Sequence, residues 1–92
     1  MIINTLIIDD DQEVRKTLSS ILEAEGYSVE VAENGKKAIR VCEKTPFDVA
    51  IIDIYLPDIE GTKLLRLLKA VSYTHLRAHE TEVMILGHYS FS

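Results

Sequence analysis

The chain has 92 residues, of which 47% are hydrophobic and 27% charged, with a formal net charge of −5 and a single cysteine. This length fits one small globular domain. No apolar run approaches transmembrane length, and the first residues do not resemble a signal peptide. We therefore expect a cytoplasmic protein without membrane contact. The net negative charge argues against direct nucleic-acid binding by this segment, since phosphate backbones need clustered Lys and Arg.

An apolar strand opens the chain and is followed directly by Asp9, Asp10 and Asp11. One of the last two acids can cap the helix that comes next, with Arg15 on its outer side. The apolar residues of this helix recur at helical spacing, at Val14, Leu18, Ile21 and Leu22. Gly26 is expected to end the helix in a left-handed conformation.

Two shorter elements follow. Residues 27–31 alternate between apolar and polar side chains, which is the period of a half-exposed strand at the edge of a sheet. The pair Asn34-Gly35 is a turn pattern. After it, a short helix is expected to place Ala38 and Cys42 inward.

The most apolar strand is predicted at residues 49–53, with the sequence VAIID. A continuous run of small and branched apolar residues is typical of a strand buried on both faces. Pro57 and Gly61 mark a loop, and a helix is expected from about Thr62 to Ala70. Residues 82–86 predict a fourth strand.

These elements predict an α/β fold with a doubly wound parallel sheet. The two most apolar strands belong in the middle, so the first and third are adjacent, and the order is 2-1-3-4. Asp9, Asp10 and Asp53 then meet at the carboxyl edge of the sheet, at a topological switch point where open α/β sheets bind ligands.

Three carboxylates at one edge repel each other, by on the order of 4 kcal/mol for a pair at ~4 Å and an effective dielectric of ~20. A cation offsets this repulsion, and hard oxygen ligands in this number suit Mg²⁺. An Asp carboxylate is also a competent phosphoryl acceptor. The alternative is that Asp9, Asp10 and Asp11 only cap a helix. Asp53, at the end of a second buried strand, favours the cation site.

Two stretches, LIIDDD at residues 6–11 and IIDIYLPDIEG at residues 51–61, resemble the receiver domain of two-component response regulators. The resemblance implies a flavodoxin-like receiver fold in which Asp53 is the phosphoacceptor. It also implies Mg²⁺ held by Asp9, Asp10, Asp53 and the backbone carbonyl of Tyr55. The donor implied is a histidine kinase or phosphotransfer protein, and the output domain or partner stays unidentified.

The chain also departs from this family. Receivers carry Ser or Thr at the end of the fourth strand, where this sequence has Gly87 and His88, and the family's fifth-strand Lys, fifth strand and last helix are missing. An interaction-only pseudo-receiver is therefore an alternative to a phosphorylated signalling module. A Mg²⁺-dependent phosphohydrolase is less favoured, because the position of its general acid is Tyr55. We expect a signalling domain and not an enzyme.

Residues 71–81, VSYTHLRAHET, resemble the in-frame translation of a transposase-adaptor end used in sequencing libraries. We therefore expect residues 1–92 to form a single receiver domain with an anomalous insert. In this interpretation residues 1–70 are the well-matched part, residues 71–81 the insert, and residues 82–92 a damaged fourth strand and end.

Overall fold

The computed structural model describes residues 2–75 and 82–86, and the side chains of residues 2–70. The strands run in chain order as β1 Asn4–Ile8, β2 Ser28–Ala32, β3 Val49–Asp53 and β4 Glu82–Leu86. The helices are α1 Gln12–Ala24, α2 Gly35–Lys44 and α3 Gly61–His75. The strands form one parallel sheet in the order β2-β1-β3-β4, which confirms the predicted topology.

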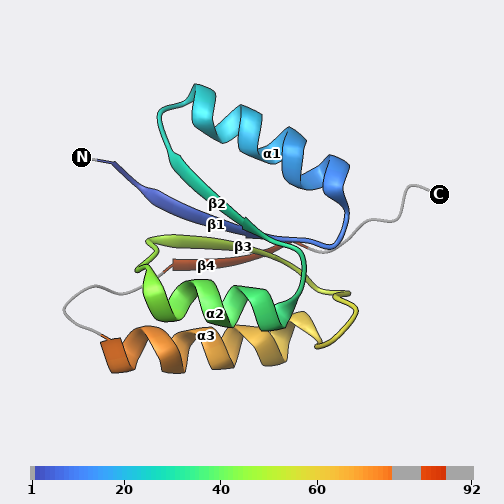
Figure 1. Cartoon of the computed structure of the whole chain (residues 1–92), viewed down its shortest axis with the longest axis vertical. Coiled ribbons are helices and arrows are strands. Elements are labelled where there is room, and N and C mark those ends of the chain that lie inside the picture. The colour runs from blue at the N-terminus through green and yellow to red at the C-terminus, as the bar shows by residue number, and fades with distance from the viewer. Residues whose placement is uncertain (1, 76–81, 87–92) are drawn as a thin grey trace.

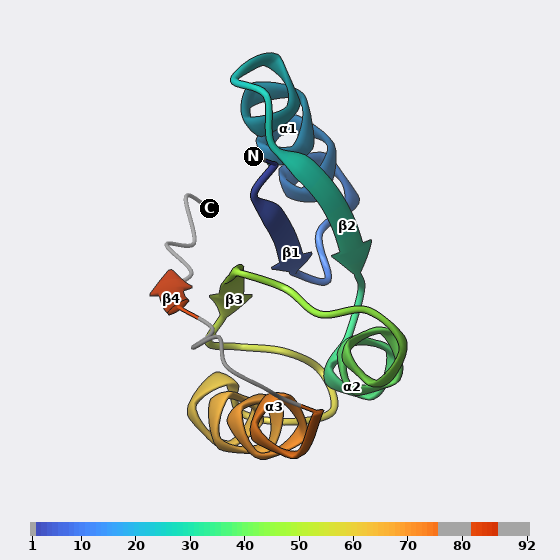
Figure 2. The ribbon, with the colours of Figure 1, turned by 90° about the vertical axis from the view of Figure 1, so that its left-hand side faces the viewer.

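Helices cover both faces of this sheet (Figure 1). α1 lies over β1 and β2 on one face, whereas α2 and α3 lie side by side on the other (Figure 2). Because the strands are all parallel, their carboxyl ends lie at one edge of the sheet. In the described part of the chain, no helix is both long and apolar enough to cross a membrane.

The core lies between the sheet and the layer formed by α2 and α3. Its buried residues come from both layers and from the connections between them: Leu6, Ile8, Ala32, Ala38, Phe47, Ala50, Ile52, Leu56, Leu64 and Leu68. Burying a single Leu or Ile side chain stabilises a fold by roughly 1.5–3 kcal/mol. This packing therefore fixes the two central strands against α2 and α3.

The prediction that β3 is buried on both faces is wrong for one face. Ala50 and Ile52 are buried, but Val49 and Ile51 are only half-buried. The reason is that α1 contacts β1 and β2 and, within the described residues, makes no contact with β3. Ile7, which pairs with Ile51 from the neighbouring strand, is fully buried.

The amino edge of the sheet carries a reciprocal pair of hydrogen bonds between β1 and the residue that precedes β3. The Asn4 N–H donates to Asp48 Oδ2 at 2.9 Å, and the Asp48 N–H donates to the Asn4 carbonyl at 2.8 Å. Further along, Ile8 pairs with Ile52. The two strands are thus bonded in register from their first residues.

The ends of α1 agree with the sequence pattern. Asp11 is the N-cap, and its Oδ1 accepts the N–H groups of Glu13 at 2.8 Å and Val14 at 3.4 Å. Gly26 has a φ of +94°, as predicted for the residue that ends this helix. The acidic triplet is therefore divided, because its last member caps α1.

The ends of α2 and α3 differ from prediction. The pair Asn34-Gly35 does not form a separate turn: Asn34 is the N-cap of α2, and its Oδ1 accepts the Lys37 N–H at 2.8 Å. Asn suits both roles, because its side chain bonds nearby backbone N–H groups in turns and at caps. α3 continues beyond Ala70 to His75, so the backbone of residues 71–75, the first part of the expected insert, is helical.

Candidate functional site

Three carboxylates converge at the carboxyl edge of the sheet. Asp9 and Asp10 follow β1, and Asp53 is the last residue of β3. One carboxylate oxygen from each lies within 4.8 Å of the other two. The convergence follows from the pairing of Ile8 with Ile52, which places the next residue of each strand at the same level. The predicted meeting of these three acids is therefore confirmed.

One of the two carboxylate oxygens of Asp53 has no hydrogen-bond partner among the described residues. The residue is 3% exposed, and its Oδ1 accepts the Tyr55 N–H at 2.9 Å. Its Oδ2 is buried and has no hydrogen-bond partner among the described residues. Leaving a buried carboxylate oxygen unpaired is costly, so this atom is available to a cation or a hydrogen-bond donor.

Asp9 is held by the start of α1. The residue is 7% exposed, and its Oδ1 accepts the Asp11 N–H at 2.9 Å. The Arg15 guanidinium donates from Nη1 to the Asp9 carbonyl at 2.7 Å. The expectation that Arg15 lies on the outer side of the helix is thus wrong, since its side chain is half-buried and turns back to the acidic loop. Helical spacing alone does not reveal this contact.

The donor set of the cluster fits Mg²⁺. Three carboxylates supply hard oxygen ligands, of which two belong to buried residues and the third, from Asp10, is exposed to solvent. Mg²⁺ prefers such ligands and keeps several waters, which an open side of the site allows. The ligand role of the Tyr55 carbonyl stays a prediction. Gly87 and His88, where the family has its hydroxyl, lie outside the described residues.

The loop between β3 and α3 contains two further residues of interest. Tyr55, two residues after Asp53, has a side chain that is 69% exposed. Sequence reasoning missed Asp58, whose carboxylate accepts N–H groups at the start of α2. Pro57 before it indicates a loop, but no sequence signal relates Asp58 to its partners Gly35 and Lys36.

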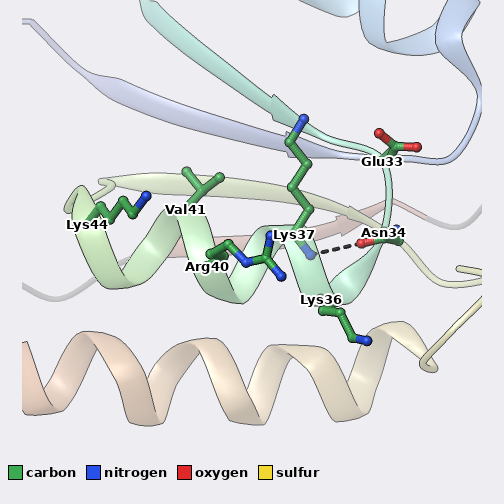
Figure 3. A pocket seen from close by; sticks show the side chains of 7 residues that line it. All are labelled: Glu33, Asn34, Lys36, Lys37, Arg40, Val41 and Lys44. Atoms are coloured by element: carbon green, nitrogen blue, oxygen red, sulfur yellow. Dashed lines mark hydrogen bonds between the residues drawn. The ribbon is translucent and has the colours of Figure 1, made fainter.

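A hollow of about 470 Å³ runs along the exposed side of α2 (Figure 3). It is lined by Glu33, Asn34, Lys36, Lys37, Arg40, Val41 and Lys44. Four of these side chains are cationic, and none of the three clustered carboxylates lines the hollow. The acidic site and this basic surface are therefore separate features of the molecule.

Comparison with known proteins gives one consistent result. The family described as response regulator receiver domain matches residues 5–90. The regulatory protein VanRc of Enterococcus gallinarum is 34% identical over 68 residues, which are 74% of this chain and 29% of that protein. A CheY-like receiver domain structure from Methanospirillum hungatei JF-1 has a TM-score of 0.85 at 31% identity, covering 98% of this chain and 67% of that one.

A second solved structure includes ligands. The response regulator TrrA from Thermotoga maritima, in complex with Mg²⁺ and BeF, has a TM-score of 0.80 at 27% identity. The match covers 97% of this chain and 72% of that one. The curated relative is much longer, and this chain spans less than a third of its length.

Proposed function

The chain belongs to the response regulator receiver domains of two-component signalling, and on this basis we propose that Asp53 accepts a phosphoryl group with Mg²⁺. The observation that supports this most is the state of the Asp53 carboxylate. It lies at the end of a central strand, 3% exposed, with Oδ2 unpartnered in the described part of the chain and with Asp9 and Asp10 oxygens within 4.8 Å.

In the proposed reaction, the donor is a phosphohistidine of a histidine kinase or phosphotransfer protein. The Asp53 carboxylate attacks the phosphorus atom in line, the O–P bond forms and the P–N bond breaks. The imidazole leaves with the electron pair of the P–N bond and takes up a proton, and Asp53 becomes an aspartyl phosphate. The Tyr55 N–H, bonded to Oδ1, holds the carboxylate in one orientation for this attack.

Asp9, Asp10 and Asp53 would hold the metal ion, with the Tyr55 carbonyl as a further ligand. When bound, Mg²⁺ supplies neutralisation of the charge on the transferring phosphoryl group. The structural relative solved with Mg²⁺ and BeF supports this part of the proposal. Arg15 fixes the backbone of Asp9, and so contributes to the position of the acidic loop.

Labelling with acetyl phosphate and Mg²⁺, followed by intact mass, tests the acceptor. The wild-type chain should gain one phosphoryl group, and Asp53→Asn, which keeps the shape but removes the nucleophile, should gain none. Asp48→Asn is the matched control, because Asp48 lies at the other end of β3 and Asn keeps an acceptor for the Asn4 N–H. Label that survives in Asp53→Asn would place the acceptor elsewhere.

Titration with Mg²⁺ tests the metal site separately. Asp10→Ala should weaken binding by about tenfold or more, since it removes one of few protein ligands. Asp11→Asn is the control, because Asn caps a helix about as well as Asp and Asp11 lies outside the cluster. Equal affinity of Asp10→Ala and the wild-type chain would contradict the site.

We also propose that residues 1–70 carry the receiver part, residues 71–81 an insert, and residues 82–92 an altered end. The division rests on the resemblance of residues 71–81 to an adaptor sequence. The match to VanRc spans 68 residues, whereas the match to the regulatory protein AtoC of Escherichia coli spans 81 and the family match continues to residue 90. Long-read sequencing of the source locus across codons 70–82 tests it, and an unchanged reading would refute the insert. A cytoplasmic location and an output domain or partner outside this chain belong to the same proposal.

A further inference from the structure

The loop that follows Asp53 is closed at its base. The Gly61 N–H donates to the Ile54 carbonyl at 2.9 Å, and Tyr55 and Glu60 form an antiparallel bridge. The Tyr55 N–H that reaches Asp53 Oδ1 belongs to this closed base. The loop is therefore directly continuous with the group that orients the Asp53 carboxylate.

The tip of the same loop is bonded to the first turn of α2. Asp58 Oδ1 accepts the Gly35 N–H at 2.9 Å, and Asp58 Oδ2 accepts the Lys36 N–H at 3.0 Å. The next donor, the Lys37 N–H, is bonded to the local cap Asn34 at 2.8 Å. The first turn of α2 thus shares its free N–H groups between a local side chain and a carboxylate from a distant loop.

Charge and shape both reinforce this contact. The bond from the Gly35 N–H, followed by that from Lys36, lowers the pKa of Asp58, so the carboxylate is ionised at neutral pH. A Cβ on Gly35 would collide with Ile59 Cγ2, and Ile59 in turn packs against the core. The loop tip and the helix are therefore in direct contact, and any residue larger than glycine at position 35 would force Ile59 to shift.

We propose that Asp58 is a positioning residue for the phosphorylation of Asp53: by bonding the loop tip to α2, it holds the loop base and the Tyr55 N–H in place. This inference rests on the proposed acceptor role of Asp53. α2 packs on β1, β2 and α3, and so provides a fixed reference for the loop. Misplacement of a reacting group by about 1 Å can slow a reaction by about 100-fold.

The test compares Asp58→Ala with Asn34→Ala in the 92-residue chain. Both variants remove a cap from the same end of α2, but only Asp58→Ala frees the loop. The rate of labelling by acetyl phosphate should fall about tenfold or more in Asp58→Ala and stay unchanged in Asn34→Ala. Asp58→Asn keeps one acceptor oxygen, and its labelling rate should lie between those of the wild-type chain and Asp58→Ala. An equal loss in both alanine variants, or none in either, overturns the proposal.

Amide hydrogen exchange gives a readout that does not depend on phosphorylation. The amides of Tyr55 and Gly61 should exchange about tenfold faster in Asp58→Ala, and at the wild-type rate in Asn34→Ala. Unchanged exchange in Asp58→Ala overturns the positioning role, whether or not the chain takes up label. A wild-type chain that takes no label contradicts the acceptor role of Asp53 instead, so the two failures are distinct.

Discussion

Gly61→Ala should disturb the acceptor site through backbone contact alone. A Cβ at Gly61 would lie 2.8 Å from Ile54 Cα, which is 0.6 Å inside the 3.4 Å at which ordinary contact begins, and 2.9 Å from the Asp53 carbonyl. Both neighbours are backbone atoms, so relief requires movement of the chain next to Asp53. Overpacking of this kind costs about 1–3 kcal/mol, whereas replacing Gly in a helix gains at most about 1 kcal/mol.

We therefore expect Gly61→Ala to lower the free energy of unfolding by about 1–2 kcal/mol and the labelling rate of Asp53 by about tenfold. Urea denaturation measures the first quantity and timed acetyl phosphate labelling the second.

Gly26→Ala is the control for this prediction. Its φ of +94° is strained for Ala by about 1–2 kcal/mol, but no atom lies within 4 Å of the added Cβ. This variant should lose similar stability and keep the wild-type labelling rate. Wild-type stability and labelling in Gly61→Ala would refute the reasoning from close backbone approach.

Three further outcomes are expected. Leu64 is fully buried, so Leu64→Ala should lower the free energy of unfolding by about 2–5 kcal/mol. Leu67 is 44% exposed, so Leu67→Ala should lower it by less than about 1 kcal/mol. Urea denaturation measures both losses, and equal losses would contradict the assigned core. Burial raises the pKa of the Cys42 thiol to about 11. At pH 8, iodoacetamide should therefore alkylate Cys42 at least about tenfold more slowly in the folded chain than in the chain unfolded in urea. Equal alkylation rates would contradict the burial of the thiol. Because the pKa of Asp58 is lowered on folding, the stability that its charge contributes is present above the unfolded value of about 3.9 and is lost as the pH falls through the folded value. The difference in unfolding free energy between the wild-type chain and Asp58→Asn should thus shrink from pH 7 to pH 3, and a constant difference would argue against the two N–H bonds.

Strand order could be predicted because the two most apolar strands belong in the middle of such a sheet, and the acidic cluster because each acid directly follows or ends one of these strands. The run at residues 49–53 is apolar up to Asp53, and the strand ends at that residue. The contacts of Asp58 could not be predicted, since its partners Gly35 and Lys36 are 23 and 22 residues away along the chain and no periodicity relates them. Arg15 was misplaced because helical spacing does not show a long side chain turning back toward the N-terminus.

The sequence pattern also could not predict that one face of β3 is only half-buried. An apolar run indicates that a strand avoids water, but it does not state which helix covers each face. Here α1 lies over β1 and β2, the two strands that it connects, and not over β3 in the described part of the chain. Ile51 is therefore less buried than its neighbour Ile7 in spite of similar chemistry.

The bonds between Asn4 and Asp48 at the amino edge belong to the same register that brings Asp53 beside Asp9 at the opposite edge. A strand advances about 3.3 Å per residue and turns its side chains to the other face at each step. A slip of one residue between β1 and β3 would move Asp53 past Asp9 by that distance and turn its carboxylate away. The position of the three carboxylates thus depends on the pairing along the whole of β1 and β3, including residues at the far end of both strands.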